Sequence, residues 1–222
     1  MAVPVTSARM FDLVMVEFHS LPRGALAPLA VLSVLAEAIT LASWFLRPRA
    51  DLLLLAASLL VAVAGLVVAY AASMQMIRET PSRRGLLRYL GVVLVMVTPV
   101  LAGLFSIPVS VSTGIGALAA LGFGLLLACI VLLPMLAAWP LLQSVSPRLI
   151  GPREAFRRSR GMRWPLVLLA FVVSGATRVI PETHSADTPF EAVLLAGLNA
   201  ALGLFLTMLF IAVGVAAFKH MN

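Results

Sequence analysis

Long uncharged runs alternate with short segments rich in arginine along this sequence. A helix needs about 20 largely apolar residues to cross a bilayer, because each residue adds about 1.5 Å and the hydrocarbon is about 30 Å thick. Such runs cover residues 24–46, 52–74, 89–109, 114–143, 164–180 and 192–218. The pattern predicts an all-α, polytopic transmembrane helix bundle of about six spans, in a single domain over residues 1–222.

The uncharged runs differ in how clearly they define a span. Residues 52–74 and 192–218 contain no charged residue. None occurs between Arg88 and Arg148 either, so this stretch is long enough for two spans. We expect these two spans to be joined by a tight turn over residues 110–114.

The run over residues 164–180 is the shortest. Only 14 residues lie between Arg163 and Arg178, which corresponds to about 21 Å of helix. A helix of that length crosses the hydrocarbon only if Val179 and Ile180 extend it and the Arg178 side chain reaches along it to the headgroups. The sequence leaves open whether this segment spans fully.

The composition indicates that lipid is the solvent of most side chains. Hydrophobic residues make up 62% of the 222 residues and charged residues 11%. An average soluble domain has about 45–50% and about 25%. A water-soluble fold of this size could not bury so much apolar surface, whereas a bilayer accepts it on the outside of the protein.

The placement of arginine predicts sidedness. Cytoplasmic loops of membrane proteins carry an excess of Lys and Arg. With the N-terminus inside, the inner segments hold 13 of the 16 Lys and Arg residues, leaving Arg47, Arg49 and Arg178 outside. Both termini are therefore expected in the cytoplasm. Arginine confined to short loops also argues against nucleic acid as a partner, because no basic stripe on a soluble face is available.

The segment before the first span has an amphipathic pattern. Met10, Phe11, Val14, Phe18 and Leu21 recur at three- and four-residue spacing. This pattern predicts a helix lying in the inner membrane interface. The alternative is a polar-capped extension of the first span.

The segment over residues 146–164, SPRLIGPREAFRRSRGMRW, is the strongest local feature. Pro147 and Pro152 suit the first position of a helix. The pattern predicts a basic amphipathic helix at the inner membrane surface. One side would hold Leu149, Pro152, Ala155, Phe156, Ser159 and Met162. The candidate lipid- or partner-binding residues are Arg153, Arg157, Arg158, Arg160 and Arg163. The alternative is that these arginines only fix the topology.

Two polar residues inside the predicted spans are candidates for function. Glu37 lies about midway along the first span, where an ionised carboxylate costs several kcal/mol. It must be protonated, paired or facing water. The residue serves either as a substrate counter-ion or proton relay, or as a neutral interhelical contact. Asn199 is its expected partner, and with Thr207 it suits interhelical contact as well as binding.

Small residues and prolines predict how the spans pack. Helices approach closely in lipid through small side chains. Three stripes at four-residue spacing are present: Gly65, Ala69 and Ser73; Gly116, Ala120 and Gly124; and Asn199, Gly203 and Thr207. Pro99 and Pro134 each remove a backbone donor and predict kinks in the third and fourth spans.

The basic segment carries a family resemblance. The stretch GPREAFRRSRGMRWPLVLLAF resembles the loop and span of YciC-like integral membrane proteins and of the membrane domain found ahead of glycerophosphodiester phosphodiesterase domains. Matching residues are Gly151, Pro152, Ala155, Arg158, Ser159, Gly161, Arg163 and Trp164. The stretch usual between the serine and the glycine is shortened here to Arg160. The resemblance implies a bacterial inner-membrane protein, and it does not extend to phosphodiesterase activity, because no acid-and-histidine set for a metal is present.

The residues give little support for an enzyme. No HExxH, phosphate-loop or nucleophile-elbow motif occurs, and the single Cys129 lies within an apolar run. No cofactor is expected. The main hypothesis is a non-enzymatic membrane protein that packs with other membrane components, with itself, or with anionic lipid through its basic loops. The alternative is a small transporter or permease subunit that uses Glu37 and Asn199.

Overall fold

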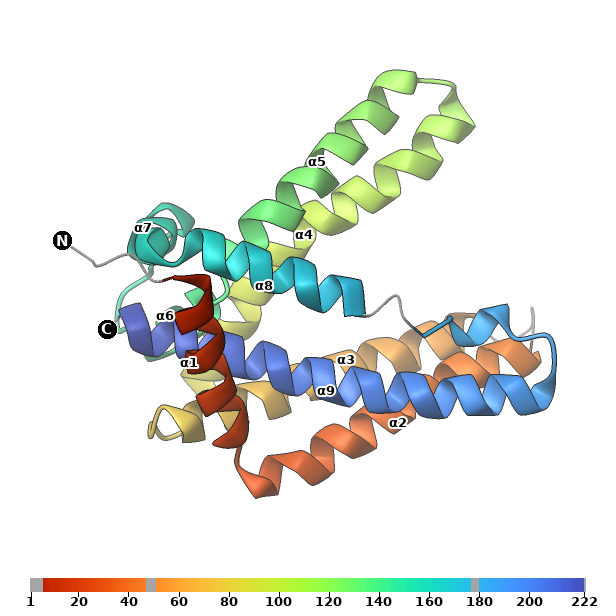
Figure 1. Ribbon diagram of the computed structural model, residues 1–222. Coiled ribbons are helices and arrows are strands. Elements are labelled where there is room, and N and C mark those ends of the chain that lie inside the picture. Colours follow the sequence, from red (N-terminus) through yellow and green to blue (C-terminus); the bar gives the residue numbers. More distant parts are fainter. Residues whose placement is uncertain (1–5, 47–50, 177–179, 222) are drawn as a thin grey trace. The chain divides into compact units, whose positions relative to one another are not determined.

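The computed structural model describes residues 6–46, 51–176 and 180–221, and every regular element among them is helical (Figure 1). The elements are α1 (Ser7–His19), α2 (Arg23–Leu46), α3 (Asp51–Met76), α4 (Arg83–Thr113), α5 (Gly116–Met135), α6 (Trp139–Val145), α7 (Pro152–Arg158), the 3-10 turn η1 (Ser159–Gly161), α8 (Arg163–Ala176), the 3-10 turn η2 (Thr183–Ser185) and α9 (Pro189–Met221).

Five of these helices, α2, α3, α4, α5 and α9, are long and apolar enough to cross a membrane. In α2, α3, α4 and α5 only 6–11% of the most apolar stretch is buried within the chain, against 44% in α9. So much exposed Leu, Val and Ile is stable only against hydrocarbon. The chain is an integral membrane protein with an all-α bundle, as its sequence predicts.

The predicted fourth span, residues 114–143, is wrong as a single helix. Helix α5 ends at Met135, and α6 begins at Trp139 after a short turn. Pro140, at the start of α6, explains the break. In a continuous helix its ring would clash with the carbonyl of Leu136, which is the residue that caps α5.

The position of the hairpin turn also differs from the prediction, and the fifth run forms a shorter helix than predicted. Helix α4 continues through Pro99 to Thr113, so the tight turn lies at Gly114 and Ile115, later than the sequence predicts. The fifth run forms α8, a helix of 14 residues that is shorter than the hydrocarbon is thick. Ile180 lies in a bend and does not extend it. The expected contribution of Arg178 and Val179 lies outside the described residues, as do Arg47 and Arg49.

The N-terminal helix is confirmed, but its predicted face is only partly right. Met10 and Val14 are fully buried in α1, and Leu21 beyond its end is buried as well. Phe11 is 52% exposed, because it follows Met10 directly and so points about 100° away from it around the helix.

By contacts the chain divides into two compact units. The first comprises Met1–Asp12, Ser82–Ala170 and Ala216–Asn222, and the second comprises Leu13–Pro81 and Phe171–Val215. Helices α1, α8 and α9 have residues in both units, so the division does not separate two consecutive stretches of chain. Each unit has its own pair of packed helices and its own candidate site.

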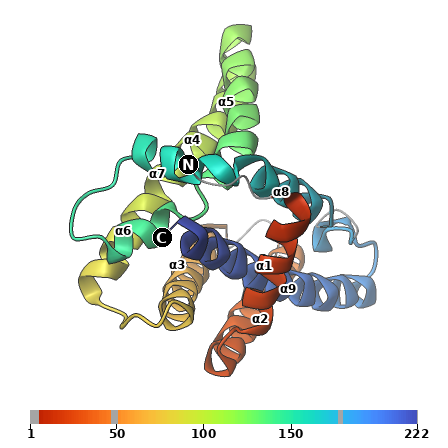
Figure 2. The same ribbon diagram turned by 60° about the vertical axis from the view of Figure 1, so that its left-hand side comes forward.

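In the first unit, α4 and α5 form an antiparallel hairpin, and they lie side by side in Figures 1 and 2. Gly114 ends α4 in the left-handed conformation, with φ of 70°, and reverses the chain. The Ser110 hydroxyl donates to the Ile115 carbonyl at 2.8 Å, which satisfies a backbone group in the turn. Gly103 and Gly122 face each other along the hairpin, so a Cβ on Gly122 would lie 2.9 Å from the Gly103 carbonyl oxygen.

In the second unit, α2 contacts both α3 and α9. The Ser33 hydroxyl donates a hydrogen bond of 2.6 Å to the Ala200 carbonyl, and a Cβ on Gly203 would lie 3.0 Å from the Ser33 oxygen. The ring centroids of Phe18 and Phe205 are 5.5 Å apart. At the η2 end, an apolar cluster of Ala186, Ala192 and Leu195 packs with Leu41, Trp44 and Ile180.

Candidate functional site

The basic segment of the first unit is held by polar side chains from neighbouring helices. In α6 the Trp139 indole N–H donates to the Ile150 carbonyl at 2.8 Å. The Gln143 amide oxygen accepts from the Ile150 N–H at 2.6 Å, and its nitrogen donates to the Arg148 carbonyl at 3.1 Å. Arg88 of α4 donates to the Ser146 carbonyl and, at 3.1 Å, to the Pro147 carbonyl. These bonds fix the chain that leads into α7.

Helix α7 begins at Pro152 with Gly151 before it, as the sequence predicts, but Pro147 lies in a bend and begins no helix. Its predicted apolar side is only partly correct. Ala155, Ser159 and Met162 are 0–2% exposed, but Leu149 is 83% exposed. Leu149 lies before α7 in a stretch without regular structure, so helical periodicity does not apply to it.

Two of the five candidate arginines are engaged within the segment. Arg158 donates to the Glu154 carboxylate at 2.7 Å, and Arg148 donates to the same oxygen at 3.0 Å. The hydrogen bond from Arg158 lowers the pKa of the Glu154 carboxyl below its ordinary 4.5, and the charge of Arg148 acts in the same direction. The Arg163 guanidinium lies over the Phe156 ring, 3.5 Å from its centroid, and donates to the Phe156 carbonyl at 3.1 Å.

The other three arginines, Arg153, Arg157 and Arg160, are exposed. They occupy positions i, i+4 and i+7, which share one side of a helical segment. None of the three forms an ion pair with a carboxylate of the described residues. The structure therefore separates the five predicted arginines into an internally bonded pair, Arg158 and Arg163, and an exposed basic face, which we define as Arg153, Arg157 and Arg160; of these, Arg157 acts on Glu154 through its charge alone.

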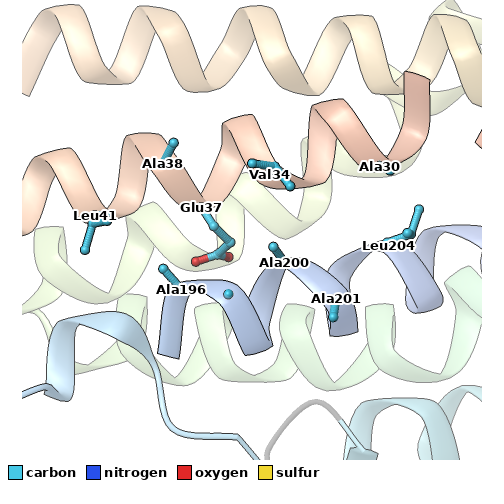
Figure 3. A pocket seen from close by; sticks show the side chains of 10 residues that line it. Ala30, Val34, Glu37, Ala38, Leu41, Ala196, Ala200, Ala201 and Leu204 are labelled. Carbon is cyan, nitrogen blue, oxygen red and sulfur yellow. The ribbon is translucent and has the colours of Figure 1, made fainter. Parts of the chain in front are cut away.

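The second candidate site is a groove between α2 and α9 in the second unit (Figure 3). It has a volume of about 350 Å³. Its lining residues are Ala30, Val34, Glu37, Ala38, Leu41, Ala196, Gly197, Ala200, Ala201 and Leu204. Figure 3 shows the Glu37 carboxylate directed from α2 toward α9, between Ala196 and Ala200. Glu37 is the one ionisable residue among those that line this groove.

Glu37 and Asn199 do not bond to each other, in contrast to the expectation from the sequence. The Thr183 hydroxyl donates to Glu37 Oε2 at 3.3 Å. The Asn199 amide donates to the Pro181 carbonyl at 3.0 Å. Each polar side chain thus holds the short segment that contains η2. Thr207 bonds to Gly203 of its own helix, at 2.8 Å, and does not bridge to another helix.

Sequence reasoning missed three residues of these sites: Trp139, Gln143 and Thr183. Gln143 is 3% exposed and Thr183 is 1% exposed, although both are polar. A buried polar side chain needs a hydrogen-bond partner: Gln143 bonds to the chain before α7, and Thr183 bonds to the Glu37 carboxylate of α2. In the sequence, Gln143 could have been identified as a candidate because it is an amide side chain at the end of a long apolar run.

Among the residues that the structure describes, no three His, Cys, Asp or Glu side chains come together in a way that could hold a metal ion. No protein-family model matches this chain, and no curated protein or solved structure matches it either. The two sites are therefore interpreted from their own chemistry.

Proposed function

We propose that this chain is a non-enzymatic protein of the bacterial inner membrane that binds anionic lipid, and packs with other membrane components, through the basic face of α7 and η1. The observation that carries the proposal is the division among the arginines. Arg148 and Arg158 share the Glu154 carboxylate in two ion pairs, whereas Arg153, Arg157 and Arg160 are exposed on one side and form no ion pair with a carboxylate of the described residues.

Electrostatics gives this face a preference for anionic headgroups. An arginine near an anionic membrane surface contributes about 1 kcal/mol. Three arginines acting together would contribute roughly 3 kcal/mol, which corresponds to about a hundredfold in affinity. The exposed Leu149 and Trp164 lie near the two ends of the segment, and side chains of these types suit insertion among headgroups.

The bonds inside the segment support binding without rearrangement. Arg88, Trp139 and Gln143 hold the chain before α7, and Arg163 is held against Phe156 after it. A basic face on a scaffold that is already ordered loses less conformational entropy when it binds. These bonds support a preformed lipid-binding site. They give less support to the alternative that the arginines act only as topology signals.

The test compares two triple variants that lose the same charge. Arg153→Gln, Arg157→Gln and Arg160→Gln together remove the basic face, and Arg9→Gln, Arg83→Gln and Arg84→Gln remove three exposed arginines elsewhere. Each protein is purified in mild detergent with equal phosphatidylglycerol and phosphatidylcholine, and retained lipid is counted by mass spectrometry. We expect the first variant to lose the preference for phosphatidylglycerol and the second to keep it.

The proposal would be overturned if the wild type and the basic-face variant retained the same amount of phosphatidylglycerol, and if every protein that copurifies with the wild type also copurified with the variant. An equal loss in both triple variants would show that net charge alone attracts the lipid. Screening by salt gives a second check, since the preference should weaken as the ionic strength rises.

A further inference from the structure

The α2–α9 groove is large enough to hold a small ligand. Its volume of about 350 Å³ falls within the range of known ligand pockets, about 300–1,000 Å³. On α2 the lining positions recur at about three and four residues, and on α9 they follow the same spacing, so each helix contributes one face. Small residues on α9 leave space on that side of the groove: Ala196, Gly197, Ala200 and Ala201.

The lining combines an apolar surface with one acidic group. Apart from Glu37, every lining residue is Ala, Gly, Val or Leu. These side chains offer no hydrogen bonds, and a ligand gains affinity from them only through apolar contact. Glu37 supplies the one place in the groove where a polar group of a ligand can be bound through a side chain.

The Glu37 carboxylate has capacity left for a ligand. Its Oε2 accepts a hydrogen bond from Thr183 at 3.3 Å, which is long for a bond between oxygens. This is the hydrogen bond that the described residues make to the carboxylate, which has about four acceptor sites, and the His184 ring acts on it through its charge. A carboxylate among apolar side chains is strongly stabilised by a cationic donor, because the interaction is little screened there.

We propose that this groove binds a lipophilic amine, with its ammonium group on the Glu37 carboxylate and its alkyl chain along Ala200, Ala201 and Leu204. The complementarity is specific: one cationic donor for one acidic acceptor, and hydrocarbon for the remaining lining. Two sources share this chemistry, a free long-chain amine and the ammonium headgroup of an aminophospholipid. The site is independent of the basic face, because it uses other residues in the other unit.

The first arm of the test measures binding of spin-labelled tetradecylamine to the full chain in phosphatidylcholine nanodiscs. The immobilised fraction is read by electron paramagnetic resonance. Glu37→Gln should weaken binding roughly tenfold to a hundredfold, the usual effect of losing a charge-assisted hydrogen bond. Glu182→Gln is the matched control, since it removes an exposed acid of the same unit that does not line the groove.

The second arm fills the groove without changing charge. A Cβ at Gly197 meets no atom within 4 Å, so Gly197→Leu places its side chain in open space and the protein should still fold. We expect this variant to exclude the amine. Gly124→Leu is its control, because Gly124 also faces open space but lies on α5. Circular dichroism and gel filtration verify that both variants remain folded.

The third arm replaces the ligand. Spin-labelled tetradecanol has the same alkyl chain and no charge, and it should bind at least tenfold more weakly than the amine. Nanodiscs that contain phosphatidylethanolamine then identify the source: displacement of the amine supports an aminophospholipid, and no displacement supports a free amine. Equal binding of amine and alcohol, or unchanged binding by Glu37→Gln or Gly197→Leu, would overturn the proposal.

Discussion

In the α4–α5 hairpin a glycine of one helix faces a glycine of the other, whereas in the α2–α9 pair the small residues of α9 face a groove. A Cβ on Gly122 would approach both Ser106 and the Gly103 carbonyl, and a Cβ on Gly197 would meet nothing within 4 Å. Both pairs are rich in glycine and alanine. The two helix pairs differ in what lies opposite the small residue: Gly122 faces the α4 backbone, whereas Gly197 faces open space.

This comparison shows that small residues permit close helix packing but do not by themselves produce it. In the hairpin, Gly103 and Gly122 coincide along the two helices, and the backbones meet. Along α9, a Cβ on Gly203 would meet the Ser33 hydroxyl, while a Cβ on Gly197 would meet nothing and Gly197 lines the groove. One arrangement is suited to stability and the other leaves space for a ligand.

The largest expected effect is at the glycine contact of the hairpin. Gly122→Leu should destabilise the protein by about 3 kcal/mol, because the side chain would have to displace the α4 backbone. Gly124→Leu on the same helix should change stability by much less, since that position is open. Thermal unfolding in detergent measures both. Equal midpoints for the two variants would show that the hairpin is not closed through Gly122.

A smaller effect is expected at the turn that directs the hairpin. Gly114→Ala should cost about 1 kcal/mol, because an alanine at φ of 70° places its Cβ too close to the following carbonyl. Gly116→Ala is the control within α5, where a Cβ meets nothing and alanine favours the helix. If the two variants unfold at the same temperature, the left-handed turn does not constrain the hairpin.

The groove pair has its own contact, which should be weaker than the hairpin's. Ser33→Ala removes the hydrogen bond to the Ala200 carbonyl and should cost about 0.6 kcal/mol, the average for interhelical bonds in membranes. Ser58→Ala is the control, because the Ser58 hydroxyl bonds to Leu54 within its own helix. A loss of stability as large as that of Gly122→Leu would contradict the expectation that the α2–α9 contact is the weaker of the two.

The smallest effect concerns Glu154 of the first unit, which bonds to two arginines, whereas Glu37 accepts a hydrogen bond from the Thr183 hydroxyl. The pKa of Glu154 is lowered in the folded state, so its contribution to stability is present above the ordinary value of 4.5 and is lost as the pH falls through the folded pKa. Glu154→Gln should lower the thermal midpoint slightly at neutral pH. The two proteins should converge well below pH 4.5. Glu79→Gln, which removes an exposed acid elsewhere, is the charge-matched control and should not lower the midpoint at neutral pH.

The helices themselves could be predicted from the sequence, because their cause is local. A run without charge and of sufficient length favours a helix in lipid, whatever surrounds it. The bounds of α2, α3 and α9 accordingly lie within a few residues of the prediction. The break before α6 was also local, and Pro140 could have indicated it.

The partners of the polar and small residues could not be predicted, because lipid and protein interior are both apolar. A span in hydrocarbon has apolar residues on every side, so its pattern does not tell which side faces another helix. The stripe of Gly116, Ala120 and Gly124 was expected at a helix contact, but all three are exposed, and Gly122 makes the contact. Likewise Glu37 is bound by Thr183, a residue 146 positions away that no spacing rule connects to it.

The turn at Gly114 has a consequence for biosynthesis. Between Arg88 and Arg148 the chain carries no charge, and at the tip the hydroxyls of Ser110 and Thr113 bond to backbone carbonyls. Moving this tip through hydrocarbon therefore requires no ion to leave water and leaves those carbonyls satisfied. Because only Gly114 and Ile115 connect them, α4 and α5 are suited to enter the bilayer together as a helical hairpin.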